Sequence, residues 1–149
     1  MTRKSDPPSK REVLTPGDYE ALAAFRFAVR RYLAFAERGA RLAGLTAQQH
    51  QALLAIKAHT LVRPMTIGDL AAQLLVKHHS AVELLGRLEK AGFTERTVDP
   101  DDRRKVQVSL TQGGEAVLAS LSASNLKELQ VAAPAFSGLL GRLAKLDGQ

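Results

Sequence analysis

The stretch TIGDLAAQLLVKHHSAVELLGRLEKAGFTERTVDPDDRRKVQVSLT, residues 66–111, decides the fold. TIGD at its start has the pattern of a helix N-cap and predicts a short helix with an inward-facing apolar side. In the next run, four apolar residues between Ala81 and Leu88 form a stripe at helical spacing, and Gly92 supplies a left-handed helix stop. The two predicted helices therefore meet across a tight turn near Leu75 to Lys77.

A β-hairpin is predicted directly after these helices. FTERTV and KVQVSL alternate apolar and polar residues as strands do, and Asp99–Arg104 joins them. This loop is longer than a two-residue hairpin turn, so it projects beyond the strands. Three aspartates stand next to Arg103, Arg104 and Lys105. The loop is either a solvated tip whose charges cancel or a device that contacts a negatively charged partner.

The composition favours one helical domain with a polyanionic partner. The chain has 149 residues, 45% hydrophobic and 24% charged, with 5% aromatic residues and a formal net charge of +6. A positive balance favours nucleic acid or an anionic membrane surface as partner. The absence of cysteine excludes disulfides, thiolate metal sites and thiol-based redox sensing. Because no secretory signal and no run of about 18 apolar residues is present, we expect a cytoplasmic protein without a membrane partner.

The two ends of the chain carry more apolar surface than one core requires. Residues 1–14 have the composition of a flexible basic arm, either solvated or touching phosphates. Thr15 then caps a helix whose apolar residues cover more than one stripe, as in a helix central to a core or paired with another chain. A capping box, TAQQ, opens a second helix over about residues 47–58. Thr111 caps a later helix that Pro134 breaks or kinks, and a last leucine-rich helix follows.

This order of elements predicts a mainly α (α+β) fold, the winged helix-turn-helix arrangement, which usually docks in a DNA groove. The runs RLEKAGF (87–93), DPDDRR (99–104) and VSLTQGG (108–114) resemble the multiple antibiotic resistance regulator (MarR) family of bacterial transcription factors. The resemblance spans about residues 18–147.

The resemblance implies a domain layout and an oligomeric state. It implies one domain over 15–149, with a DNA-binding part at 46–110 and dimerisation helices at 15–44 and 111–149, in a homodimer whose terminal helices intertwine. An ordinary monomer core built from the same helices is the alternative.

The start of the second helix of the pair is the candidate surface for reading DNA. The first turn of a recognition helix reaches base edges, and its amides favour phosphate. Val82 fits a thymine methyl, whereas Glu83 either accepts a hydrogen bond from cytosine or pairs with Arg87 four residues later. Family members often carry polar or basic side chains at these two positions, so the base preference cannot be transferred. The candidate residues off the apolar stripe are Lys77, His78, His79, Ser80, Val82, Glu83 and Arg87.

The hairpin loop is the second candidate contact. The resemblance matches Arg104 to a wing-tip arginine that enters the minor groove and Asp102 to the acid that orients it. A narrow minor groove has an enhanced negative potential that attracts arginine. Arg103 and Lys105 would flank phosphates. Asp101 stands where the family commonly has an arginine, which opposes this contact.

Other chemistries lack support in the sequence. His79 and Glu83 share a helical face but have no third metal ligand. Adjacent helical residues point about 100° apart, so Ser80 and His79 do not form a nucleophile and base. His50 and His59 are expected to be packing or surface residues. We therefore expect no enzyme, no metal and no cofactor.

The sequence predicts a dimeric, DNA-binding transcriptional regulator, a repressor at an inverted-repeat operator. Family resemblance adds release by a small aromatic or anionic effector, although no residue set defines its pocket. The alternative is a winged-helix module that docks on another protein through the same hairpin.

Overall fold

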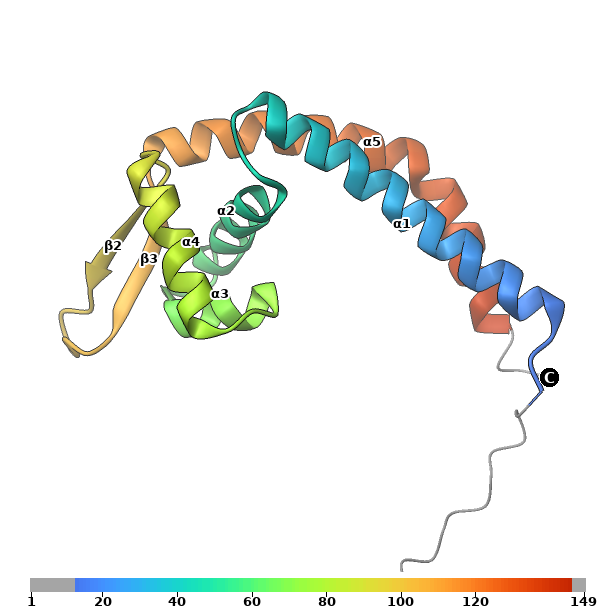
Figure 1. Ribbon diagram of the computed structural model, residues 1–149, viewed down its shortest axis with the longest axis horizontal. Helices are drawn as coiled ribbons and strands as arrows, with labels where there is room; N and C mark the ends of the chain where they lie inside the picture. The colour runs from blue at the N-terminus through green and yellow to red at the C-terminus, as the bar shows by residue number, and fades with distance from the viewer. Residues whose placement is uncertain (1–12, 146–149) are drawn as a thin grey trace, which may run out of the picture. The chain divides into compact units, whose positions relative to one another are not determined.

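A computed structural model describes residues 13–145, so residues 1–12 of the predicted basic arm lie outside the described part of the chain. The described residues form two compact units. The central unit is Ala34–Glu128, and the terminal unit comprises the described residues before Ala34 and after Glu128. The elements (Figure 1) are α1 (Pro16–Leu42), α2 (Ala47–Thr60), β1 (Met65–Thr66), α3 (Ile67–Leu74), α4 (His78–Lys90), β2 (Thr94–Val98), β3 (Val106–Leu110) and α5 (Gln112–Lys145).

Threonine caps fix where the helices begin. The Thr15 hydroxyl accepts a hydrogen bond from the Asp18 amide at 3.3 Å, and Pro16 occupies the first helical position. Thr46 and Thr66 each form a capping box with the residue three positions later. These starts agree with the sequence predictions.

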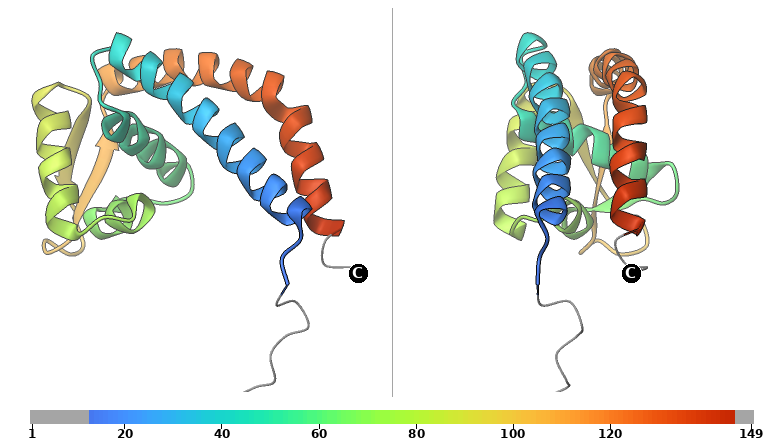
Figure 2. Two further views of the ribbon diagram at one scale, coloured as in Figure 1. Left: turned by 45° about the vertical axis from the view of Figure 1, so that its right-hand side comes forward. Right: turned by 90° about the vertical axis from the view of Figure 1, so that its right-hand side faces the viewer.

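The sheet of the central unit is small and antiparallel, with strand order β1-β3-β2. Val108 at its centre pairs with Met65 on one side and Arg96 on the other. Figure 2 shows α4 beside the β2–β3 hairpin. Since Met65 and Val108 are buried, the short strand β1 joins the hairpin to the helical core. This arrangement confirms the mainly α winged helix-turn-helix prediction.

The hydrophobic core lies within the central unit. α2, α3 and α4 each bury one apolar face, as their residue spacing predicts. The largest fully buried side chains are Leu53, Ile56, Met65, Leu70, Leu85, Leu88 and Val108. This packing fixes α3, α4 and the hairpin relative to one another within the unit.

Two helix ends differ from the sequence predictions. α5 runs without interruption past Pro134 to Lys145, so the separate last helix was a wrong prediction. The fixed φ of proline is compatible with a helix. The long helical segments on both sides of Pro134 offset the cost of the one backbone hydrogen bond that proline cannot donate. α2 continues to Thr60, two residues beyond the expected end.

The terminal unit consists of the first part of α1 and the last part of α5, which lie side by side (Figures 1 and 2). Phe25 and Phe136 meet edge to face, with ring centroids 6.4 Å apart. Among its described residues, only Ala21 and Leu139 are buried apolar residues. None of the helices in residues 13–145 is long and apolar enough to cross a membrane.

Candidate nucleic-acid interface

The turn between α3 and α4 is made by an unusual leucine. Leu75 has φ 56° and ψ 40°, which makes it the one non-glycine residue with positive φ in the described chain. The Val76 amide donates to the Ala71 carbonyl at 3.0 Å, which closes the turn. The turn therefore lies where the sequence predicts, but a leucine adopts the conformation that glycine favours.

The first turn of α4 is open to solvent. Lys77 is the N-cap and makes no side-chain capping bond, so it leaves the first amides of the helix unblocked by its own side chain. Ala81, Leu84, Leu85 and Leu88 are buried. Ser80 and Val82 are half-buried, and the other predicted contact residues are exposed: Lys77, His78, His79, Glu83 and Arg87.

The far end of α4 is tied to the sheet by an ion pair that the sequence analysis missed. Arg96 on β2 donates to both carboxylate oxygens of Glu89, at 2.5 and 3.0 Å. These bonds lower the pKa of Glu89. Within residues 13–145, Glu83 and Arg87 form no ion pair with each other, so the predicted helical pairing is absent. The turn at Gly92 separates the two partners, so helical spacing gives no signal for the Glu89–Arg96 bridge.

Asp99 organises the wing, the loop between β2 and β3. Its Oδ1 accepts hydrogen bonds from the amides of Asp101 and Asp102, at 2.8 and 3.3 Å. Its Oδ2 accepts a hydrogen bond from Gln107 Nε2 at 3.2 Å. The Asp101 amide is the main cause that lowers the pKa of Asp99. Both carboxylate oxygens of Asp99 therefore accept hydrogen bonds from within the hairpin.

Arg104 is held by Asp102 and directed outward. Asp102 Oδ1 accepts from the Arg104 amide at 3.1 Å and from its Nε at 3.3 Å, while the Arg104 side chain is 93% exposed. Arg103 and Lys105 are also exposed. The geometry brings Asp102 and Arg104 together as the sequence analysis expects. Within the described chain, the Asp101 carboxylate forms no hydrogen bond or ion pair, so its charge stays on the wing surface.

The base of the wing depends on a close backbone approach. The Thr111 hydroxyl accepts from the Gly114 amide at 3.1 Å and donates to the Gly92 carbonyl at 2.5 Å. A Cβ on Gly114 would lie 2.1 Å from the Phe93 carbonyl oxygen. The TQGG run is thus required for α5 to start against Phe93, directly before the beginning of β2, a physical reason that sequence reasoning did not find.

The remaining histidines, His50 and His59, are not part of the surface formed by the start of α4 and the wing. His50 is buried in α2, and burial lowers its pKa. His59 Nε2 lies 3.5 Å from Asp69 Oδ2. In the described part of the chain, no group of three His, Cys, Asp or Glu residues is arranged to hold a metal ion.

Comparisons with known proteins identify the family. Residues 43–105 match the family model described as MarR family. The transcriptional activatory protein BadR of Rhodopseudomonas palustris is 33% identical over 90 residues, 60% of this chain and 51% of BadR. A crystal structure of a MarR family transcription regulator has 28% identity and a TM-score of 0.69, and the match covers 87% of this chain and 84% of that chain. The chain belongs to the MarR family.

The family assignment and the fold agree. A Staphylococcus aureus MepR mutant, solved bound to an oligodeoxyribonucleotide, has a TM-score of 0.64, with 91% of this chain and 98% of that chain covered. At 21% identity, this likeness shows the fold alone. The chain has the fold of MarR-family transcription regulators and spans about half the length of the curated relative BadR, and the relatives that it matches are named transcriptional regulators.

Proposed function

We propose that this MarR-family chain binds double-stranded DNA as a homodimer at an inverted-repeat operator, represses transcription there, and is released by a small aromatic or anionic effector. The observation that carries the DNA-binding part is the wing. Arg104 is almost fully exposed while Asp102 fixes its backbone and its Nε. A guanidinium that is pre-oriented and solvent-facing loses little freedom on entering a minor groove.

α4 supplies the major-groove contact in this proposal. Its amides and the His78, His79 and Ser80 side chains offer hydrogen bonds to phosphates or base edges at the start of the helix. Val82 contacts a thymine methyl, and the unpaired Glu83 accepts from a cytosine amino group. Lys77 and Arg87 flank this surface and neutralise phosphates.

The wing supplies the minor-groove contact. Arg104 enters the groove, and Arg103 and Lys105 contact the phosphates on either side. Asp99 and Asp102 use their charges on amides and on Arg104, which removes most of the repulsion that three aspartates would cause. Asp101 opposes binding, so Asp101→Asn should raise affinity.

The terminal unit supplies the dimer contact. Its exposed large apolar residues on α1 and α5 include Leu22, Phe27, Leu33, Val131 and Leu140, each more than half exposed. Solvent-facing apolar side chains on paired helices favour burial against a second chain. In this layout, residues 15–44 and 111–149 form the dimerisation part and residues 46–110 the DNA-binding part of a single domain. The DNA-bound MepR structure supports the proposal by its fold.

Selection of bound fragments from random duplex DNA tests the partner and the symmetry together. An inverted repeat with half-sites about one helical turn apart is the expected result. The selected duplex then serves for affinity measurements between about 50 and 200 mM salt, where log affinity should fall steeply with log salt. A protein-docking module would select no motif and form no specific complex.

Arg104→Ala tests the wing, and Arg41→Ala is the matched control because Arg41 also pairs with a carboxylate, Glu37 at 3.1 Å, on α1. Arg104→Ala should weaken DNA binding by about 1–3 kcal/mol and reduce the salt slope by about one. Arg41→Ala should leave both unchanged. Equal affinities for the two variants would remove the wing from the interface.

A transcription reporter carrying the selected operator tests the sign of regulation. A repressor lowers expression from this promoter. BadR is named an activatory protein, so a rise in expression would assign that role instead.

A further inference from the structure

A groove of about 420 Å³ lies in the central unit, and none of the residues proposed to contact DNA lines it. One wall is the segment between α2 and β1, and the other is formed by β2 and β3. Its volume falls in the range of small-molecule sites. The lining residues are Thr60, Val62, Arg63, Pro64, Thr97, Gln107, Val108 and Ser109.

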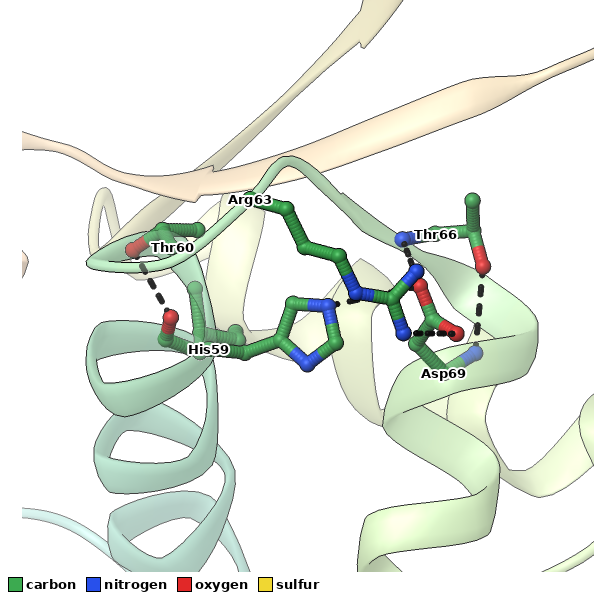
Figure 3. Close-up of polar contacts among 6 residues, drawn as sticks. His59, Thr60, Arg63, Thr66 and Asp69 are labelled. Atoms are coloured by element: carbon green, nitrogen blue, oxygen red, sulfur yellow. Dashed lines mark hydrogen bonds and ion pairs between the residues drawn. The ribbon is translucent and has the colours of Figure 1, made fainter.

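Arg63 is the cation of this groove, and its present partner holds it loosely. Its Nη2 lies 3.8 Å from Asp69 Oδ1, and the Arg63 side chain is 65% exposed. Asp69 has other partners: the Thr66 amide, which is the main cause lowering its pKa, and His59 Nε2 at 3.5 Å. Figure 3 shows His59 and Arg63 both directed at this carboxylate. Arg63 can therefore bind another anion without leaving Asp69 unpartnered.

The rest of the lining combines unused hydroxyls with apolar surface. In the described chain, neither the Thr97 nor the Ser109 hydroxyl forms a hydrogen bond, whereas the Thr60 hydroxyl donates to the Ile56 carbonyl at 2.8 Å. Val62 and Pro64 supply apolar area on the opposite wall. One guanidinium, two free hydroxyls and an apolar wall suit a carboxylate attached to a small apolar body.

The groove is also connected to the wing. Gln107, one of its lining residues, donates to Asp99 Oδ2 at 3.2 Å. Asp99 in turn binds the amides of Asp101 and Asp102, and Asp102 holds Arg104. A ligand that forms a hydrogen bond with the Gln107 amide, or that displaces β3, would therefore affect Arg104 through the hydrogen-bonded residues Gln107, Asp99 and Asp102.

We propose that this groove is a binding site for a small organic carboxylate, with Arg63 as its anion-binding residue, and that occupancy changes the wing through Gln107 and Asp99. The regulatory meaning of this site rests on the proposed DNA-binding function; the binding itself does not.

Nuclear magnetic resonance of the full chain, labelled with ¹⁵N and without DNA, tests the site with phenylacetate as the probe and neutral phenylacetamide as its matched control. Phenylacetate should give saturable shifts at the amides of residues 60–64 and 107–109 and at the wing amides of residues 99–104. Phenylacetamide should bind at least tenfold more weakly, because it lacks the charge. Shifts confined to α1 and α5, or equal binding of both probes, would overturn the proposal.

Arg63→Gln should weaken phenylacetate binding at least tenfold, and Arg41→Gln, on α1, should not change it. Gln107→Leu should keep the shifts at residues 60–64 but remove those at the wing. Unchanged binding by Arg63→Gln overturns the site, and wing shifts that persist in Gln107→Leu overturn the connection. Because no DNA is present, these outcomes are independent of the operator experiment.

Discussion

The central and terminal units differ in how far they bury their apolar side chains. The central unit buries leucines from α2, α3 and α4 against Met65 and Val108, with most of these side chains fully inaccessible. In the described terminal unit, only Ala21 and Leu139 are buried apolar residues, while Phe27 is 63% and Val131 79% exposed. Both units are built from amphipathic helices, so helical periodicity alone does not distinguish a complete core from half of an interface.

The difference assigns separate roles to the two units. A unit that closes its own core holds α4 and the wing in a fixed geometry, which a DNA-reading surface requires. A helix pair with exposed apolar faces gains stability from a second copy of the chain, since burial of each large side chain contributes about 1.5–3 kcal/mol. The stability of the central unit should therefore be independent of protein concentration, whereas the stability of the terminal unit should depend on it.

The largest effect on stability is expected from a substitution that leaves a cavity in the core of the central unit. Leu85 is fully buried on α4, so Leu85→Ala should lower the free energy of unfolding by about 2–5 kcal/mol, through lost burial and the cavity left behind. Urea unfolding at two protein concentrations measures this loss, which should be equal at both. Leu61→Ala, at a 74% exposed position, is the control and should change stability by less than about 0.5 kcal/mol. A loss below about 1 kcal/mol for Leu85→Ala would contradict the packing described.

The second effect concerns association. Phe27→Glu places a charge on the exposed apolar face of the terminal unit, next to Arg31, whose guanidinium lies 6.0 Å from the ring centroid. In a symmetric dimer the change occurs twice, so the dimer dissociation constant should rise at least hundredfold, about 2.8 kcal/mol. Sedimentation velocity over a concentration series measures it. Leu61→Glu makes the same change in the central unit, and if it dissociates the dimer as strongly, the assignment of the interface to the terminal unit is wrong.

Local signals in the sequence were sufficient for most of the central unit. The capping threonines, the apolar stripes and the alternation of the strands each involve residues a few positions apart, and all were found where predicted. The Asp102–Arg104 contact, which the family resemblance implied, is equally local, since the partners are two positions apart. The Asp99–Gln107 bond, the Glu89–Arg96 bridge and the Arg63 groove join residues that only the folded sheet brings together, so no spacing rule revealed them.

Pro134 is the opposite case: the local signal for a helix break was strong, but the helix continues through it. A proline predicts a break by its own chemistry, but the helical segments on both sides and the Phe25–Phe136 contact favour one helix. Gly114 shows a third case: the motif was recognised by resemblance, whereas its cause, the approach to Phe93, exists only in the folded chain.

The third effect tests that approach, where α5 starts against Phe93, directly before the beginning of β2. Gly114→Ala would put a methyl group 2.1 Å from the Phe93 carbonyl oxygen, so backbone must shift, at a cost of about 1–3 kcal/mol. Gly113→Ala is the matched control, since its methyl group would lie 3.4 Å from the nearest atom and alanine favours a helix. Thermal or urea unfolding compares them. If Gly113→Ala destabilises as much as Gly114→Ala, the close contact is not the reason for the glycine.

The smallest effect is a gain in stability at the turn between α3 and α4. Leu75 adopts a left-handed conformation that costs an L-residue about 1–2 kcal/mol, and its side chain is 93% exposed, so it contributes little burial in return. Glycine removes the strain but loses more backbone entropy on folding, so Leu75→Gly should stabilise the central unit by about 0.5–1 kcal/mol. Gly92→Ala is the reciprocal control: φ is +81° and no atom lies within 4 Å of the added methyl group, so only the backbone term should appear, as a loss of about 1 kcal/mol. Both changes appear as shifts of the urea midpoint at constant slope, and a destabilised Leu75→Gly would show that the leucine side chain packs against the chain rather than facing solvent.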